Sequence, residues 1–167
     1  MNKHSHNNRN GKENGFSLIE VLLAVVIMSL AVLSLLAASA AFTQANSAGT
    51  DLSTAEFLIE QIRELTAMLP VIDPDPGTAI FGPEEAALAD YDDVDDFHNA
   101  TFSPPISASR LPLNDFSQFS QHVTVQTIEP ANLEQVSATH KGFVRVIVTV
   151  SINSREISSA NWIRATH

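Results

Sequence analysis

The feature that most constrains this chain is a continuous apolar run of 27 residues from Phe16 to Phe42, in which Glu20 is the only charged side chain. As an α-helix at about 1.5 Å per residue, the run would span roughly 40 Å, and about 20 apolar residues suffice to cross the hydrocarbon core of a bilayer. The run therefore predicts a transmembrane helix. An ionisable group inside a membrane is costly unless it is paired, so the position of Glu20 near the start of this helix predicts a functional role.

The first residues of the run carry a resemblance to a known family. The segment Gly15-Phe16-Ser17-Leu18-Ile19-Glu20 resembles the prepilin cleavage and methylation motif of type IV pilins and type II secretion pseudopilins. In that family a prepilin peptidase and methyltransferase of the membrane cuts after the glycine and methylates the new N-terminal amine. The resemblance implies cleavage between Gly15 and Phe16, methylation of Phe16, and a role in subunit assembly for Glu20, the fifth mature residue.

The positive charge that this processing would create is complementary to Glu20. Cleavage would place a charged α-amine at Phe16 inside an apolar layer, where it is as unfavourable as the Glu20 carboxylate. Because unlike charges interact strongly at low dielectric, both costs are offset if Glu20 of one subunit contacts the Phe16 amine of a neighbour. Such a contact would also fix the axial register of subunits in a helical fibre.

The leader, residues 1–15, sets the expected orientation. It carries Lys3, Arg9 and Lys12 against Glu13, and this positive charge is expected to keep the N-terminus in the cytoplasm. We therefore expect a single-pass protein of the bacterial inner membrane, with its C-terminal domain outside the cytoplasm, that then enters a pilus or a periplasmic pseudopilus.

A secretory signal peptide is the competing interpretation of the apolar run. Ala38-Ser39-Ala40 matches an A-x-A cleavage signature that follows it. Against this interpretation, the apolar region of a signal peptide has about 7–15 residues and this run is far longer and contains Glu20.

Composition disfavours several classes of function. Without the leader, the chain keeps six of its nine Lys and Arg and 18 of its 19 Asp and Glu, a formal charge of −12. Such a surface repels nucleic acid and anionic lipid. The absence of cysteine departs from many major pilins, which close a C-terminal loop with a disulfide. The chain has no phosphate-binding glycine loop, zinc-protease helix or nucleophile elbow, so we expect no enzymatic activity.

Beyond the membrane segment, 16–42, residues 43–69 predict an amphipathic continuation of the same helix. Apolar residues recur at spacings of three and four from Leu52 to Leu69, which is one helical face, and Pro70 ends the pattern. Gly49, in the polar segment between the two halves, weakens the helix by about 1 kcal/mol without interrupting it. We expect one helix over residues 16–69.

The remainder divides into two regions. Residues 70–118 contain seven of the eight prolines and predict irregular structure, in which Pro83–Ala89 is a candidate for a short helix. Residues 119–167 predict an antiparallel β-sheet. Its expected strands are Gln121–Ile128, Gly142–Ile152 and Arg155–Ala165, with a turn at Asn153-Ser154. The valine-rich face of the middle strand should pack on the helix, which gives an α+β fold of the kind that the resemblance to pilins implies.

The second distinctive feature is the acidic segment Asp90-Tyr91-Asp92-Asp93-Val94-Asp95-Asp96-Phe97-His98. No Lys or Arg occurs between Glu64 and Ala108, and crowded carboxylates are well suited to a hard cation that takes six to eight oxygen ligands. We therefore consider a calcium site formed by Asp92, Asp93, Asp95 and Asp96, although the spacing is not that of an EF-hand. The alternative is a solvated loop that caps a helix or pairs with Arg110 or Arg145.

Taken together, these patterns favour a minor type IV pilin-like subunit that assembles with other pilin subunits through its N-terminal helix and binds no nucleic acid. The acidic segment also resembles a stretch in minor pilins of the mannose-sensitive haemagglutinin type, the D subunit in particular. Two alternatives remain open at this point. One is a type II secretion pseudopilin, and the other is a membrane-anchored calcium-binding module.

Overall fold

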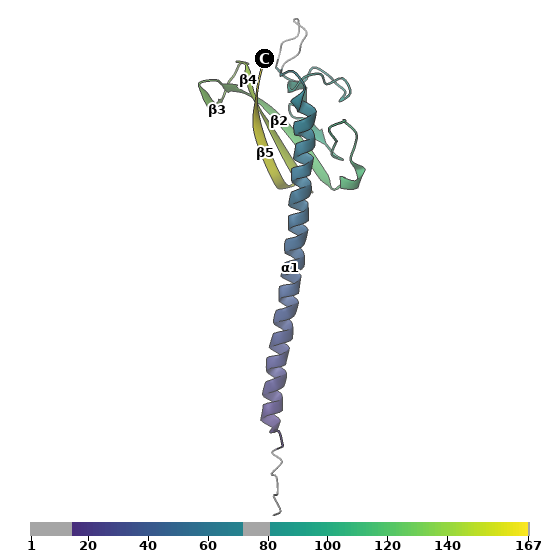
Figure 1. The fold of residues 1–167 in the computed structure, drawn as a ribbon, viewed down its shortest axis with the longest axis vertical. Coiled ribbons are helices and arrows are strands. Elements are labelled where there is room, and N and C mark those ends of the chain that lie inside the picture. Colours follow the sequence, from purple (N-terminus) through teal and green to yellow (C-terminus); the bar gives the residue numbers. More distant parts are fainter. Residues whose placement is uncertain (1–14, 72–80, 167) are drawn as a thin grey trace, which may run out of the picture. The chain divides into compact units, whose positions relative to one another are not determined.

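One helix occupies the first part of the computed structural model, which describes residues 15–71 and 81–166. Helix α1 runs from Leu18–Ala67 without interruption (Figure 1). It begins after Ser17, whose carbonyl accepts hydrogen bonds from the amides of Glu20 and Val21 at 3.0 and 3.1 Å. It ends shortly before Pro70, which cannot continue the backbone hydrogen bonds. The predicted continuity across Gly49 is confirmed, and the predicted bounds differ from the observed ones by two residues at each end.

The two halves of α1 have different environments. The chain divides into two compact units after Asn46. Every described residue up to Thr50 is exposed, whereas the second half of the helix buries one face. The buried residues of that face are Ala55, Leu58, Ile59, Ile62 and Thr66. The predicted apolar stripe is therefore confirmed, except that Leu52 at its start remains 44% exposed.

The second unit contains a five-stranded antiparallel sheet. Its strands are β1 (Thr101–Phe102), β2 (Phe119–Glu129), β3 (Asn132–Val136), β4 (Phe143–Ile152) and β5 (Arg155–Ala165). The order is β1-β2-β4-β5, and β3 pairs with the end of β2. The three long strands agree with the predicted ones. Strands β1 and β3 were not predicted, because β1 has two residues and β3 is exposed along its whole length, so neither shows an alternating pattern.

The hairpin between β4 and β5 turns at the predicted residues. Asn153 and Ser154 both have positive φ angles, 48° and 65°. Positive φ at both central residues is the geometry of a type I′ turn, whose twist matches that of the flanking strands. This turn fixes the register in which Ile152 faces Arg155.

The hydrophobic core joins the second half of α1 to the sheet, and these elements lie side by side in Figure 1. The four valines of β4 that alternate along one face, Val144, Val146, Val148 and Val150, are fully buried and join Leu58 and Ile62 of the helix in one cluster. The predicted packing of the valine face on the helical stripe is confirmed. The α+β fold class is confirmed with it.

Two polar side chains attach the helix to its surroundings. Gln121 of β2 is fully buried and donates hydrogen bonds to the carbonyls of Leu58 (2.8 Å) and Ile106 (3.2 Å), while its own oxygen accepts from the Ile106 amide (2.7 Å). Arg164 of β5 donates to the carbonyls of Thr66 and Leu69 at the end of α1. A helix C-terminus leaves such carbonyls without intrahelical partners, so Arg164 satisfies them.

The described part of residues 70–118 is irregular apart from β1 and two short 3-10 helices, η1 (Asp95–Phe97) and η2 (Asn114–Phe116). The helix considered at Pro83–Ala89 is not formed, and that prediction was wrong. A contact with another segment fixes the backbone just before Pro83. The Gly82 amide donates a hydrogen bond to Asp95 at 3.0 Å, and Gly82 has a φ of 133°, which glycine tolerates. An isolated helix of only seven residues is also unstable by itself.

We predict that Gln121→Leu lowers the stability of the second unit by about 2–4 kcal/mol, because three buried backbone groups lose their partner. The fluorescence of Trp162, the only tryptophan, can follow unfolding of the full chain in detergent. Gln126→Leu is the matched control on the same strand, at a position that is only partly buried. Equal unfolding temperatures for the two variants would contradict the role assigned to Gln121.

Candidate functional site

The predicted cleavage point lies just before α1. Gly15, Phe16 and Ser17 are exposed and precede the first helical residue, so the Gly15–Phe16 peptide bond is not part of the helix. A Cβ atom placed on Gly15 would meet nothing within 4 Å. The fold itself therefore does not require glycine at this position, and a requirement for close backbone approach by a peptidase would account for it.

Glu20 lies in the first turn of α1 with an exposed side chain. The first basic residue that follows it in the sequence is Arg63, 43 positions further along the chain. All other basic residues of the chain beyond the leader follow Arg63 in the sequence. If the leader is removed as the sequence predicts, the cationic group that lies nearest to Glu20 in the sequence is the α-amine at position 16.

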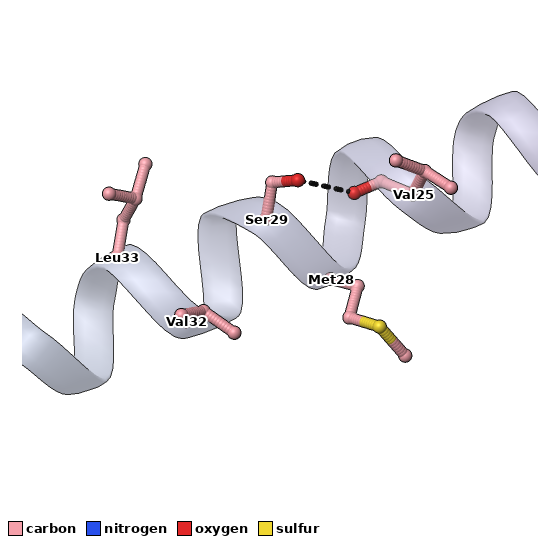
Figure 2. Close-up of a pocket in the computed structure, with 5 residues that line it drawn as sticks. All are labelled: Val25, Met28, Ser29, Val32 and Leu33. Atoms are coloured by element: carbon pink, nitrogen blue, oxygen red, sulfur yellow. Dashed lines mark hydrogen bonds between the residues drawn. The ribbon is translucent and has the colours of Figure 1, made fainter.

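The exposed part of α1 presents shallow apolar grooves. Phe16 and Glu20 lie along one groove, together with Val21, Ala24, Val25 and Met28. The next groove is lined by Val25, Met28, Ser29, Val32 and Leu33 (Figure 2). Its one hydroxyl, on Ser29, donates to the Val25 carbonyl at 2.7 Å within the helix. A lipid chain or another helix that packs into this groove would therefore make almost only apolar contacts.

The composition of α1 agrees with a membrane span. Its most apolar 18 residues have a mean hydropathy of 2.9, and none of them is buried. A core helix of a water-soluble domain would bury such a surface, since apolar surface is stabilised by its removal from water. Among the described residues, α1 is the one helix long and apolar enough to cross a bilayer.

The comparison with protein families agrees with this geometry. Residues 10–36 match the model described as the prokaryotic N-terminal methylation motif. The chain carries a prepilin-type methylation motif. The match supports a type IV pilin-like or pseudopilin subunit with prepilin cleavage and a transmembrane helix, a class of structural rather than catalytic proteins. It supports assembly with other subunits of this kind and covers the N-terminal segment alone.

No curated protein matches the chain significantly. No solved structure matches it either. For the second unit, therefore, the evidence for function is its own geometry.

In the second unit, the acidic segment folds inward. Asp93, Asp95 and Asp96 are at most 1% exposed, and Asp92 is exposed beside them. The expectation of a solvated loop was therefore wrong. Burial follows from the neighbours of these aspartates, because Val94 and Phe97 belong to the hydrophobic core and draw the η1 turn into it.

Backbone amides satisfy one oxygen of each buried aspartate. Oδ1 of Asp93 accepts from the amides of Asp95 (2.8 Å) and Asp96 (3.1 Å). Oδ2 of Asp96 accepts from Asp92 (2.9 Å) and more weakly from Asp93 (3.4 Å), and Oδ2 of Asp95 accepts from Gly82 (3.0 Å). The second oxygens, Oδ1 of Asp95 and of Asp96, are buried and have no hydrogen-bond partner among the residues that the structure describes.

The predicted arginine partners do not neutralise this cluster. The Arg110 guanidinium donates to the backbone carbonyls of Leu88, Ala89 and Tyr91. Arg145 donates to the Leu133 carbonyl. Instead of a cation, two more carboxylates adjoin the aspartates, those of Glu84 and Glu85. The sequence prediction did not count Glu84 and Glu85 among the ligands, because they lie outside the aspartate run, although they belong to the segment without basic residues from Glu64 to Ala108.

Crowding and burial favour protonation here. Burial, followed by hydrogen bonding and repulsion from Asp95, raises the pKa of Asp93 to about 8. Hydrogen bonding of a protonated Glu85 to Asp96 is the main cause that raises the pKa of Glu85 to about 7. A raised pKa in the folded state means that the stabilising contribution of the proton is complete below about pH 4 and is lost as pH rises through the folded value. As the pH rises through these values, ionisation of the cluster therefore opposes folding unless another positive charge is present.

We predict that Gly15→Val blocks removal of the leader, because a branched side chain hinders the close approach that cleavage after Gly15 requires. The precursor should accumulate in the membrane, and its intact mass should include residues 1–15. Gly11→Val, a glycine within the leader, is the matched control and should be processed normally. Normal processing of Gly15→Val would contradict cleavage at this bond.

Proposed function

We propose that this chain is a minor type IV pilin-like subunit. In this proposal the prepilin peptidase cuts after Gly15, methylates the amine of Phe16, and leaves the mature chain in the inner membrane with its C-terminal domain outside the cytoplasm. The subunit is then assembled through α1 into a pilus or pilus-like fibre. The match of residues 10–36 to the methylation motif is the observation that carries the proposal.

On assembly, the exposed apolar surface of α1 would move from lipid to contacts with other helices. In the bilayer, lipid covers the apolar side chains between Phe16 and Phe42; in a fibre, helices of neighbouring subunits take the place of lipid. Side-chain ridges of one helix pack into grooves of another, and the grooves beside Val21 and Val32 are of this kind. Small residues near the end of the run, from Ala37 to Ala41, allow close helix approach.

Glu20 supplies specificity that apolar packing lacks. An apolar helix can slide along another at little cost, whereas a buried carboxylate is stable only where it meets a positive charge. The amine of Phe16 on a neighbouring subunit offers that charge at one axial offset. Glu20 therefore acts in this proposal as the register-determining group and takes no part in cleavage.

Two features favour a minor subunit over a major one. The chain has no cysteine with which to close a C-terminal disulfide loop. Its acidic segment is similar to that of minor pilins of the mannose-sensitive haemagglutinin type, the D subunit in particular.

A type II secretion pseudopilin would have the same helix and the same motif. Deletion in the native host separates the two functions, because loss of a minor pilin impairs fibre-dependent adhesion or motility and loss of a pseudopilin impairs protein export.

We predict that Glu20→Ala leaves cleavage intact and reduces incorporation into sheared fibres by about a hundredfold. Removal of one partner of a buried ion pair leaves the other charge uncompensated, at a cost of about 3 kcal/mol or more. The ratio of subunit in sheared fibres to subunit in membranes, determined by immunoblot, measures the effect.

Ser34→Ala is the matched control for this experiment. The Ser34 hydroxyl donates to the Leu30 carbonyl within the same helix, so its removal deletes a polar group without removing a charge. Its incorporation should equal that of the unmodified chain. Normal incorporation of Glu20→Ala, or equal losses in both variants, would contradict the proposed pairing.

A further inference from the structure

We propose that the second unit binds a calcium ion in the carboxylate cluster formed by Glu84 and Glu85 on one segment, and by Asp93 together with Asp95 and Asp96 of the η1 turn on another. The cluster lies entirely in the second unit and does not involve the processing motif. The inference therefore stands independently of the proposed assembly function.

Each of three sets of carboxylates lies within the span of one coordination shell. Three overlapping sets have oxygen atoms that all lie within 4.8 Å of one another: Glu84, Asp93 and Asp95; Glu84, Glu85 and Asp96; Asp92, Asp93 and Asp96. Calcium binds oxygen at about 2.3–2.6 Å, so two of its ligands can be no more than about 5 Å apart. Because the sets share members, they form one continuous cluster and not three separate ones.

Two orphan oxygens point to a ligand. Oδ1 of Asp95 and Oδ1 of Asp96 are buried without a hydrogen-bond donor, on side chains that are at most 1% exposed. Buried polar atoms of folded proteins are almost always satisfied, and an ionised oxygen that is left without a partner is especially unfavourable. A cation beside either atom would supply the partner that it lacks and would compensate the repulsion among the carboxylates.

The donor set selects the type of metal. The nearest histidine, His98, uses Nδ1 to accept from the Val125 amide at 3.2 Å, and its Nε2 lies 3.0 Å from the Asn99 amide nitrogen. The available ligands are therefore all oxygen, which favours a hard cation over zinc or copper. Magnesium gives up its water ligands reluctantly, whereas calcium accepts a site built from many protein oxygens, so burial of the aspartates favours calcium.

The ion would join two segments to the core. Gly82, Glu84 and Glu85 lie on a stretch without helix or strand, and the η1 turn is anchored by Phe97. The Val94 amide next to this turn donates to the Pro70 carbonyl at 3.0 Å, close to the end of α1. Calcium would therefore stabilise the loop region against the helix and sheet.

The test is a calcium titration of the full chain in detergent micelles, with calorimetry for binding and Trp162 fluorescence for thermal unfolding. We expect a dissociation constant on the order of 10⁻⁴ M, as in extracellular calcium modules. At a hundredfold excess over that value, the unfolding temperature should exceed that in chelator by about 10 °C. Magnesium chloride at equal concentration controls for ionic strength and should give a much smaller shift.

Variants distinguish a ligand role from a structural one. Glu84→Gln/Glu85→Gln should weaken calcium binding at least tenfold and retain the fold, because these side chains are not fully buried. Asp95→Asn should abolish the calcium response without lowering the unfolding temperature in chelator, since its amide oxygen can still accept from Gly82. Asp90→Asn, an exposed carboxylate outside the cluster, should bind calcium normally.

The proposal is overturned if the unmodified chain shows no binding at 10 mM calcium, a concentration about a hundredfold above the expected constant. It is equally overturned if magnesium and calcium give the same shift, which indicates screening alone, or if Glu84→Gln/Glu85→Gln responds like the unmodified chain.

Discussion

The apolar surface of α1 between Phe16 and Phe42 is the constraint on which the rest of this account depends. The described part of the chain leaves that surface uncovered, so a bilayer or other helices must cover it. Glu20 restricts the choice further, because a carboxylate in an apolar layer needs a cation and the proposed processing at Gly15 would create one. The second unit, by contrast, closes its own core between the helical stripe and the valines of β4. One helix thus serves two environments, and its sequence changes from uniformly apolar to amphipathic at the division.

Much of this fold could be predicted from the sequence because its main elements have regular periods. Spacings of three and four from Leu52 to Leu69 and the alternation of valines in β4 identified both faces of the core. Elements without a period were missed: β3 is exposed throughout, and β1 and the two 3-10 turns are too short. The helix considered at Pro83–Ala89 failed because a tertiary contact between Gly82 and Asp95 determines the backbone there.

The acidic segment shows where sequence reasoning reached its limit. Crowded aspartates are visible in the sequence, but whether they face solvent depends on Val94 and Phe97, which the fold draws into the core. The contribution of Glu84 and Glu85 arises from long-range folding and has no local signal beyond the lack of basic residues. The motif from Gly15 to Glu20, by contrast, can be recognised from the sequence alone. A peptidase would bind these residues directly, so their function does not depend on the fold of the second unit.

The most direct test of the central claim is the mass and N-terminal sequence of the mature protein purified from membranes of its native host. This account predicts a chain that begins at Phe16, with a methyl group on its α-amine and without residues 1–15. A chain that begins near Ala41, or one that still begins at Met1, would contradict prepilin processing and with it the assembly role assigned to Glu20.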